Sequence, residues 1–363
     1  MSHLTTLPLL AVLAALPAEV RAAPEPRLTG VHVVARLADE GVATTSPVVA
    51  RASRKAILSV VAVVTEGGRE RIYGDVPVRL PGRRGVITPE PWPSLPVRIR
   101  WWRIEPDTVG QSFDNTAPSY HYDPIPYAET AILGAQQQWS LVADPRPTLL
   151  PSTDEWIGTM RYKAEVTALG ATLATPGAER RTLGGPDPAV LRVSYEGERG
   201  HAYVNALLAH FHQPYIWGSM GPSDRRHQAE LFIGADCADL LTAAYRRWSG
   251  KDVAYGWSAS FLPGGAYAKK HGRVVARKAS RAPDGVIRDA GGQPVTVGPG
   301  ETAQIGDVVV LPRHVGVLSE DRAPLGVLDD NDLIIHTLFA EPREEPLLRR
   351  WPNVLAIFRW HQP

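Results

Sequence analysis

The only cysteine of the 363-residue chain, Cys237, stands where the sequence predicts the start of a helix. It follows Asp236, a typical N-cap residue, and apolar residues then recur at helical spacing until Gly250 supplies a stop signal. Unpaired N–H groups and the dipole at a helix start stabilise negative charge. The pattern therefore predicts a lowered thiol pKa and donors for an oxyanion. The alternative is a buried cysteine that acts as a small apolar residue.

Two histidines on successive strand candidates can complete a catalytic set with this cysteine. His314 opens the strand candidate 314–319, and His336 follows the apolar residues 333–335 of the next one. Neighbouring antiparallel strands bring side chains within hydrogen-bonding reach, so one imidazole can orient the other. A cysteine with such a pair supplies a nucleophile, a base and an orienting group, whereas a lone histidine is usually a surface or satisfied core residue.

Four motifs, in this order along the chain, resemble those of the NlpC-type cell-wall peptidases. They are Ala202-Tyr203-Val204 with Pro214-Tyr215-Ile216-Trp217-Gly218, Gly234-Ala235-Asp236-Cys237, Gly306-Asp307-Val308-Val309 with His314-Val315-Gly316-Val317, and Ile334-Ile335-His336. The resemblance covers residues 200 to about 360. It implies a papain-like α+β domain that cleaves peptidoglycan stem peptides, typically beside a γ-D-glutamyl linkage to a diamino acid.

The resemblance also implies roles for particular residues. Cys237 matches the family nucleophile, His314 its general base, and His336 the polar residue that orients the base. Tyr215 matches a tyrosine whose hydroxyl helps to bind the oxyanion, and Asp236 an acid that meets the free amine of the substrate in some members.

Two stretches depart from the family pattern. Ser258 falls near a serine of the family's substrate pocket, but the arginine and glutamine that flank it there are absent. The family usually has Ser-Gly after its cysteine, where this chain has Ala238-Asp239. If Asp239 faces the thiolate, its charge raises the thiol pKa.

The rest of the chain predicts an organisation in three parts. Residues 1–22 resemble a signal peptide, so we expect an exported protein, periplasmic or extracellular. Residues 23–190 carry many short β-branched or aromatic runs separated by turn signals, which predicts a β-rich, sandwich- or barrel-like domain. The role of this domain is left open, with binding of wall or substrate as one candidate. Residues 200–363 form the peptidase-like domain, so the predicted class of the whole is α+β.

Within the last part, the pattern predicts two helices and four strands. The helices are expected at residues 201–213 and from Cys237 to Gly250, and residues 256–300 are expected to be mostly irregular because glycine, proline and basic residues dominate them. The strand candidates are residues 307–311, 314–319, 333–337 and 354–360.

Composition excludes several other classes of protein. With 39 basic and 38 acidic residues the net charge is +1, which gives no general reason to bind nucleic acid or an anionic membrane. One cysteine excludes an intramolecular disulfide and a multi-cysteine zinc site. After the leader no stretch is apolar for long enough to span a membrane, and the expected chemistry requires neither metal nor cofactor.

The sequence thus predicts an exported thiol peptidase that acts on peptidoglycan stem peptides through Cys237, His314 and His336. A related thiol amidase or acyltransferase would use the same three residues. A third hypothesis is a catalytically degenerate wall-binding or scaffold protein, for which Ala238 and Asp239 would be signs of decay. The oligomeric state is left open.

Overall fold

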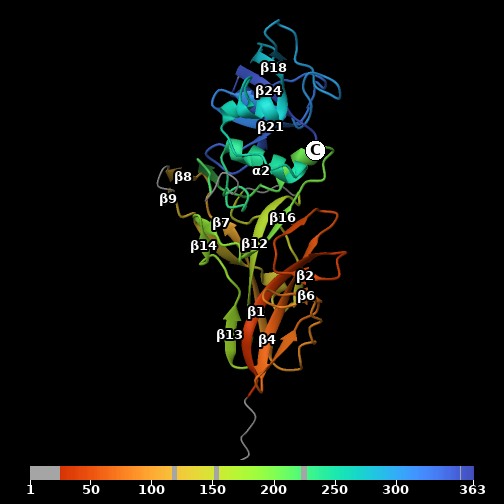
Figure 1. Cartoon of the computed structure of the whole chain (residues 1–363), viewed down its shortest axis with the longest axis vertical. Coiled ribbons are helices and arrows are strands. Elements are labelled where there is room, and N and C mark those ends of the chain that lie inside the picture. The colour runs from red at the N-terminus through yellow and green to blue at the C-terminus, as the bar shows by residue number, and fades with distance from the viewer. Residues whose placement is uncertain (1–24, 117–120, 151–154, 222–226, 352) are drawn as a thin grey trace, which may run out of the picture.

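A computed structural model describes residues 25–116, 121–150, 155–221, 227–351 and 353–363. The predicted leader, residues 1–22, lies outside the described residues. Figure 1 shows an elongated molecule, with residues 27–195 at one end and the elements that follow at the other. None of the described helices is both long and apolar enough to cross a membrane.

Two six-stranded sheets pack face to face in the first part of the chain. The first has the order β11-β4-β1-β2-β6, with β5 paired to β4, and the second the order β10-β7-β12-β16-β3, with β13 paired to β12. Their longest strands are β1 (Arg27–Leu37), β4 (Ala56–Glu66), β7 (Val97–Pro106) and β12 (Gly158–Ala168). The shorter ones are β2 (Ala43–Thr44), β3 (Val48–Ala50), β5 (Arg69–Tyr73), β6 (Val78–Arg79), β10 (Tyr127–Ala131), β11 (Ser140–Val142), β13 (Ala171–Ala174) and β16 (Leu191–Tyr195).

Strand β4 is buried along most of its length because both of its faces are covered. Its even-numbered residues, such as Leu58 and Val60, enter the core between the two sheets, together with Trp101 of β7 and Tyr162 of β12. Val61 points the other way, into a smaller apolar cluster under β2 and β6. This is the alternation that a two-residue side-chain period produces.

A seven-stranded sheet dominates the second part of the chain, in the order β19-β18-β24-β20-β21-β22-β23. Its members are β18 (Gly272–Arg281), β19 (Ile287–Arg288), β20 (Val308–Leu311), β21 (His314–Glu320), β22 (Leu333–His336), β23 (Arg343–Glu345) and β24 (Asn353–Trp360). The helices are α1 (Ala202–Leu208), α2 (Cys237–Ser249) and α3 (Ala266–Lys270), with 3-10 turns at Leu133–Ala135, Ser258–Phe261 and Leu347–Arg349.

The two faces of this sheet bury different partners. Val308 and Val310 face the layer that holds α1 and α2. Val309 and Leu311 face an apolar cluster made by β18, β19 and the loop segments around residues 295–303. The predicted strands were therefore placed correctly, because each is a short β-branched run with turn signals on both sides.

The predicted fold class is wrong. Strands and isolated bridges take up 42% of the described residues and helices 11%, in sheets that curve as half-barrels. The described part of the chain is therefore mostly β and holds no helix-rich papain-like domain. Residues 256–300 were expected to be irregular, yet β18 is a ten-residue strand that pairs with β24. The helix expected over 201–213 ends at Leu208, and two turns follow it. The domain limits remain predictions.

Two small sheets complete the fold. One pairs β14 (Arg181–Thr182) with β15 (Gly185–Pro186). The other joins the two parts of the chain, because β17 (Tyr215–Trp217) lies parallel to β8 (Ser112–Thr116), which pairs in turn with β9 (His121–Tyr122). Tyr215 is therefore held by a strand from the first part of the molecule.

Candidate functional site

Helix α2 begins as predicted, with Cys237 as its first residue and Asp236 as its N-cap. One carboxylate oxygen of Asp236 accepts the N–H groups of Ala238 and Asp239, both at 2.9 Å. At the other end Gly250 is the left-handed C-cap, with φ of 68°. Because the cap occupies two of the free amides, the donors left for an oxyanion are fewer than the sequence suggested.

The segment before α2 brings Tyr215 next to the cysteine. Ala235 pairs with Tyr215 in a parallel bridge, and the Ile216 amide donates to the Ala235 carbonyl at 3.1 Å. Gly234 permits this approach, because a Cβ there would lie 2.5 Å from a side-chain carbon of Ile216. The Tyr215 hydroxyl is buried and has no hydrogen-bond partner among the described residues. It is thus a free donor beside the thiol.

The two predicted histidines meet, as their strand positions indicated. His314 Nε2 and His336 Nδ1 are 3.1 Å apart, and the two rings are nearly perpendicular. Both side chains are fully buried. Gly316 keeps β21 close to β22, because a Cβ at this position would lie 2.4 Å from a methyl carbon of Ile334. The sulfur of Cys237 faces the backbone amide of Val315, the residue that follows His314.

A glutamate that sequence reasoning missed ends this row of side chains. His336 Nε2 lies 3.0 Å from Glu345 Oε1, and Arg343 and Arg350 flank the same carboxylate. The hydrogen bond from His336 and the nearby arginines lower the pKa of Glu345 to about 2, although burial opposes them. The available signal was its position in a short strand beside β22, where its register partner is Ile334.

These contacts fix the protons of both imidazoles. The ionised Glu345 can only accept, so Nε2 of His336 must donate, and Nδ1 of neutral His336 must then accept from Nε2 of His314. The remaining nitrogen, His314 Nδ1, is left with a free lone pair. This atom is buried and has no hydrogen-bond partner among the described residues. The arrangement therefore leaves an unprotonated ring nitrogen on His314, whose ring packs against Trp351 with centroids 5.2 Å apart. No hydrogen bond joins His314 to Cys237 among the described residues.

Burial keeps both the Cys237 thiol and the His314 imidazole neutral. Burial, the neighbouring His336 and Arg343 lower the pKa of His314 to about 3, and burial first of all lowers the pKa of His336 as well. Burial and the Asp236 carboxylate raise the pKa of Cys237 to about 12, and the amide of Val315 offsets only part of this. The prediction of a lowered thiol pKa is therefore wrong, because loss of hydration exceeds the effect of the helix start.

Asp239 does not stand unpaired beside the sulfur. Its carboxylate lies 2.6 Å from His227 Nδ1, whose ring stacks on Tyr255 with centroids 3.8 Å apart. Burial and Asp239 raise the pKa of Asp236 to about 8, so this carboxyl group is largely neutral at pH 7. Ser258 is the half-buried first residue of a 3-10 turn, and in the described part of the chain no hydrogen bond joins it to Cys237 or His314.

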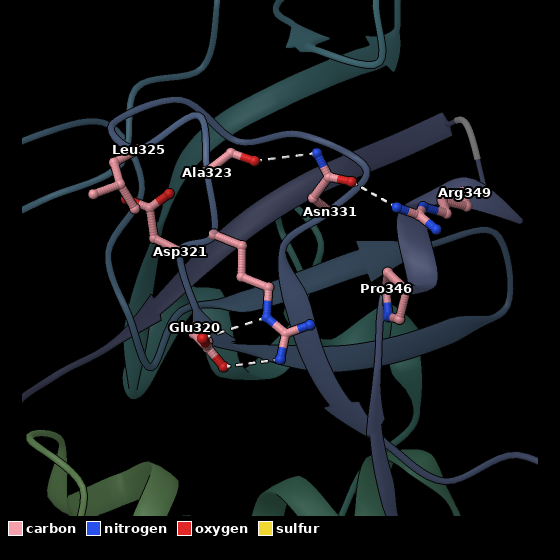
Figure 2. A pocket seen from close by; sticks show the side chains of 8 residues that line it. Glu320, Asp321, Ala323, Leu325, Asn331, Pro346 and Arg349 are labelled. Atoms are coloured by element: carbon pink, nitrogen blue, oxygen red, sulfur yellow. Dashed lines mark hydrogen bonds and ion pairs between the residues drawn. The ribbon is translucent and has the colours of Figure 1, made fainter.

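A hollow of about 700 Å³ lies at the far end of β21, and its lining residues include Glu320, Asn331 and Arg349. Figure 2 shows that Asn331 contacts both the Ala323 carbonyl and Arg349. Since β21 rises about 3.4 Å per residue, this hollow is about 20 Å from His314. At this distance the hollow is not a part of the thiol site.

The described residues contain no group of three or more His, Cys, Asp or Glu side chains arranged to hold a metal ion. No family model matches the chain, no curated protein matches it in sequence, and no solved structure matches it. The chemistry of the site must therefore be argued from its own geometry.

Proposed function

We propose that the protein is a thiol hydrolase that cleaves peptide bonds in peptidoglycan stem peptides. The observation that supports this most strongly is the row Glu345–His336–His314, which ends in an unpaired, unprotonated ring nitrogen. A buried polar atom without a partner is uncommon in a folded protein, and such atoms concentrate where a ligand or reaction completes the network. The choice of wall peptides rests on the motifs around Tyr215, Cys237 and His314.

In the proposed reaction the resting site holds a neutral thiol on Cys237 and a neutral imidazole on His314, which must approach each other for the first step. His314 Nδ1 takes the proton of Cys237 as the sulfur attacks the carbonyl carbon of the scissile amide. The tetrahedral oxyanion forms near the Tyr215 hydroxyl and the Cys237 amide, which donate to it. His314 returns the proton to the leaving amine as the C–N bond breaks. Water then attacks the thioester carbonyl, loses a proton to His314, and releases a carboxylic acid while Cys237 regains its proton.

One observation favours a second candidate, a wall-binding protein without activity. A thiol with a pKa raised to about 12 is poorly nucleophilic until a base removes its proton. In a degenerate protein the same burial would leave Cys237 inert.

The deciding experiment incubates the purified protein with purified peptidoglycan and identifies released fragments by mass spectrometry. We expect new amino termini in the stem peptide from the unaltered protein and none from Cys237→Ala. Both proteins should unfold at the same temperature, because the change removes a single sulfur atom. Ser249→Ala, a change of similar size at the other end of α2, is the control and should keep full activity. Equal activity in Cys237→Ala would refute the proposal, and binding without cleavage by the unaltered protein would support the second candidate.

A further inference from the structure

Two arginines lie directly opposite each other at the junction of the two parts of the molecule. Arg161 of β12 and Arg192 of β16 are register partners in an antiparallel pair. Like charges in this relation repel, because their Cβ atoms are only about 5 Å apart. Among the described residues, neither guanidinium lies within ion-pair distance of a carboxylate, although Arg161 is 4% exposed and Arg192 is half-buried.

Within the described part of the chain, both guanidinium groups make their direct contacts with neutral groups. Arg161 donates to the Phe232 carbonyl at 2.7 Å. Arg192 donates to the Ser194 hydroxyl at 2.6 Å and lies over the ring of Phe232, 3.9 Å from its centroid. These contacts satisfy hydrogen bonds, but they leave two positive charges uncompensated in a poorly hydrated place.

A third guanidinium adds to the uncompensated positive charge. Arg247 of α2 lies close to Arg192. Burial lowers the pKa of Arg192 well below its usual value, and the charges of Arg161 and Arg247 lower it further. Arg247 pairs with Glu196 at 2.8 Å, and the same carboxylate also lies 3.4 Å from Arg51. Among the described residues, the group Arg161, Arg192 and Arg247 therefore has one carboxylate partner, Glu196, which also pairs with Arg51.

The excess charge borders a hollow of about 420 Å³. Arg192, Arg247, Lys251 and His210 line it, together with the last turn of α2. Its two acidic residues, Glu230 and Asp252, are both bound to Arg246. His210 is 1% exposed, and its Nδ1 atom has no hydrogen-bond partner among the described residues. The hollow thus combines the Arg192 guanidinium, which has no carboxylate partner among the described residues, with a buried imidazole nitrogen that also lacks a partner.

We propose that this hollow binds the phosphate group of a small phosphorylated molecule. A guanidinium binds two phosphate oxygens side by side, and a divalent anion between Arg192 and Arg247 would neutralise the charge that the protein leaves unpaired. The neutral His210 ring can add one further N–H donor. The volume exceeds that of a phosphate ion, so an ester group fits beside it.

The site is separate from the thiol chemistry. Arg246 follows Cys237 by nine residues along α2, so the two places are about 14 Å apart along the helix axis. The proposal therefore does not depend on the proposed hydrolase activity.

The test measures binding of inorganic phosphate and of glycerol 3-phosphate to the full chain by calorimetry, and the thermal unfolding midpoint with each. Sodium chloride at equal ionic strength is the control for screening. We expect both phosphates to raise the midpoint where chloride does not, and binding to weaken as salt rises. Tighter binding of glycerol 3-phosphate would identify an organic phosphate as the ligand, and equal binding would identify free phosphate.

Substitutions distinguish arginines that bind phosphate from arginines that only stabilise the fold. Arg192→Gln should weaken phosphate binding about tenfold or more, because it removes a charge-assisted contact. Without phosphate it should unfold at the same or a higher temperature than the unaltered protein, because it removes repulsion with Arg161. Arg98→Gln, at an exposed position of β7, is the matched control and should bind phosphate normally.

Three results would overturn the proposal. The first is a phosphate effect no larger than that of chloride in the unaltered protein. The second is full binding by both Arg192→Gln and Arg247→Gln. The third is an Arg192→Gln protein that is strongly destabilised without phosphate while phosphate shifts it normally, since that marks a structural arginine. If Arg192→Gln does not fold, Arg192→Lys and Arg247→Gln decide the question, because each retains part of the charge.

Discussion

Buried polar groups at two places in the molecule differ in how completely they are hydrogen-bonded. In the first part the Tyr195 hydroxyl accepts the Ala56 amide at 3.0 Å and donates to the Ala143 carbonyl at 2.8 Å. The buried Glu105 likewise accepts from the Thr148 and Leu149 amides. In the second part the Tyr215 hydroxyl and His314 Nδ1 are equally buried and have no partner among the described residues.

This difference indicates two roles for buried polar groups, one structural and one in binding or reaction. A polar group whose bonds are all made stabilises one arrangement of the chain and has nothing left to offer a ligand. A buried group left unpaired costs free energy on folding, so its retention is most easily explained by a function. Variants that act on one kind of group but not the other test this interpretation.

The largest effect should come from the two histidines. His314→Ala should slow hydrolysis about a thousandfold, because it removes the base itself. His336→Ala should slow it less, about tenfold to a hundredfold, because it removes only the group that orients the base. Rates of fragment release from peptidoglycan would show the difference. Equal and complete losses would mean that the two roles are assigned wrongly.

The next effect concerns stability in acid. Burial lowers the pKa of His212 from 6.5 to about 4, so its contribution to folding is complete above pH 6.5 and is lost as the pH falls toward 4. The free energy of unfolding of the natural chain, relative to His212→Asn, should therefore fall by up to about 3 kcal/mol over that range.

Urea unfolding followed by tryptophan fluorescence measures this difference between pH 7 and pH 4. Asparagine suits the position, since residue 212 has a φ of 65°. His121→Asn, an exposed position in the first part of the molecule, is the control and should show no such trend. A pH-independent difference for His212→Asn would contradict the assignment.

A pair of Tyr→Phe variants tests the comparison most directly. Tyr195→Phe should lower the free energy of unfolding by about 1–3 kcal/mol, because it leaves two buried backbone groups unpaired. Tyr215→Phe should leave that free energy unchanged or higher, while hydrolysis slows about tenfold because an oxyanion donor is lost. Denaturation and activity are measured on both. A destabilised Tyr215→Phe protein with normal activity would reverse the interpretation of this hydroxyl.

The smallest expected effect belongs to Glu345. Glu345→Gln removes the charge that fixes the proton positions on His336 and His314, so hydrolysis should slow about tenfold. Glu344→Gln is the matched control, since its carboxylate pairs with Arg199 at 2.6 Å instead. Nitrogen NMR of the histidine rings should report a changed tautomer only in Glu345→Gln. An unchanged tautomer would remove Glu345 from the proposed relay.

The sequence predicted local features better than the fold. The cap at Asp236, the end of α2 at Gly250 and the strands around His314 and His336 depend on short-range chemistry that a few residues encode. The papain-like fold was wrong because these motifs say nothing about how much helix surrounds them. Strand β18 was missed because its basic residues lie on a sheet surface that tolerates polar side chains.

The thiol environment was predicted wrongly for a related reason. A helix start lowers a thiol pKa only where water still reaches the sulfur, and the burial of Cys237 depends on segments far apart in the sequence. Glu345 was missed because register across β22 and β23 brings it to His336, and a single sequence does not reveal register.

The parallel pairing of β17 with β8 determines whether the second part of the chain can fold as a separate fragment. Ile216 packs with Phe113 and Ile125 in one apolar cluster, so a fragment starting near residue 200 would leave Ile216 uncovered and Tyr215 without its neighbouring strand. Cutting the chain between the two large sheets should therefore yield a C-terminal fragment that aggregates and does not hydrolyse peptidoglycan, even though every residue of the proposed relay remains in it.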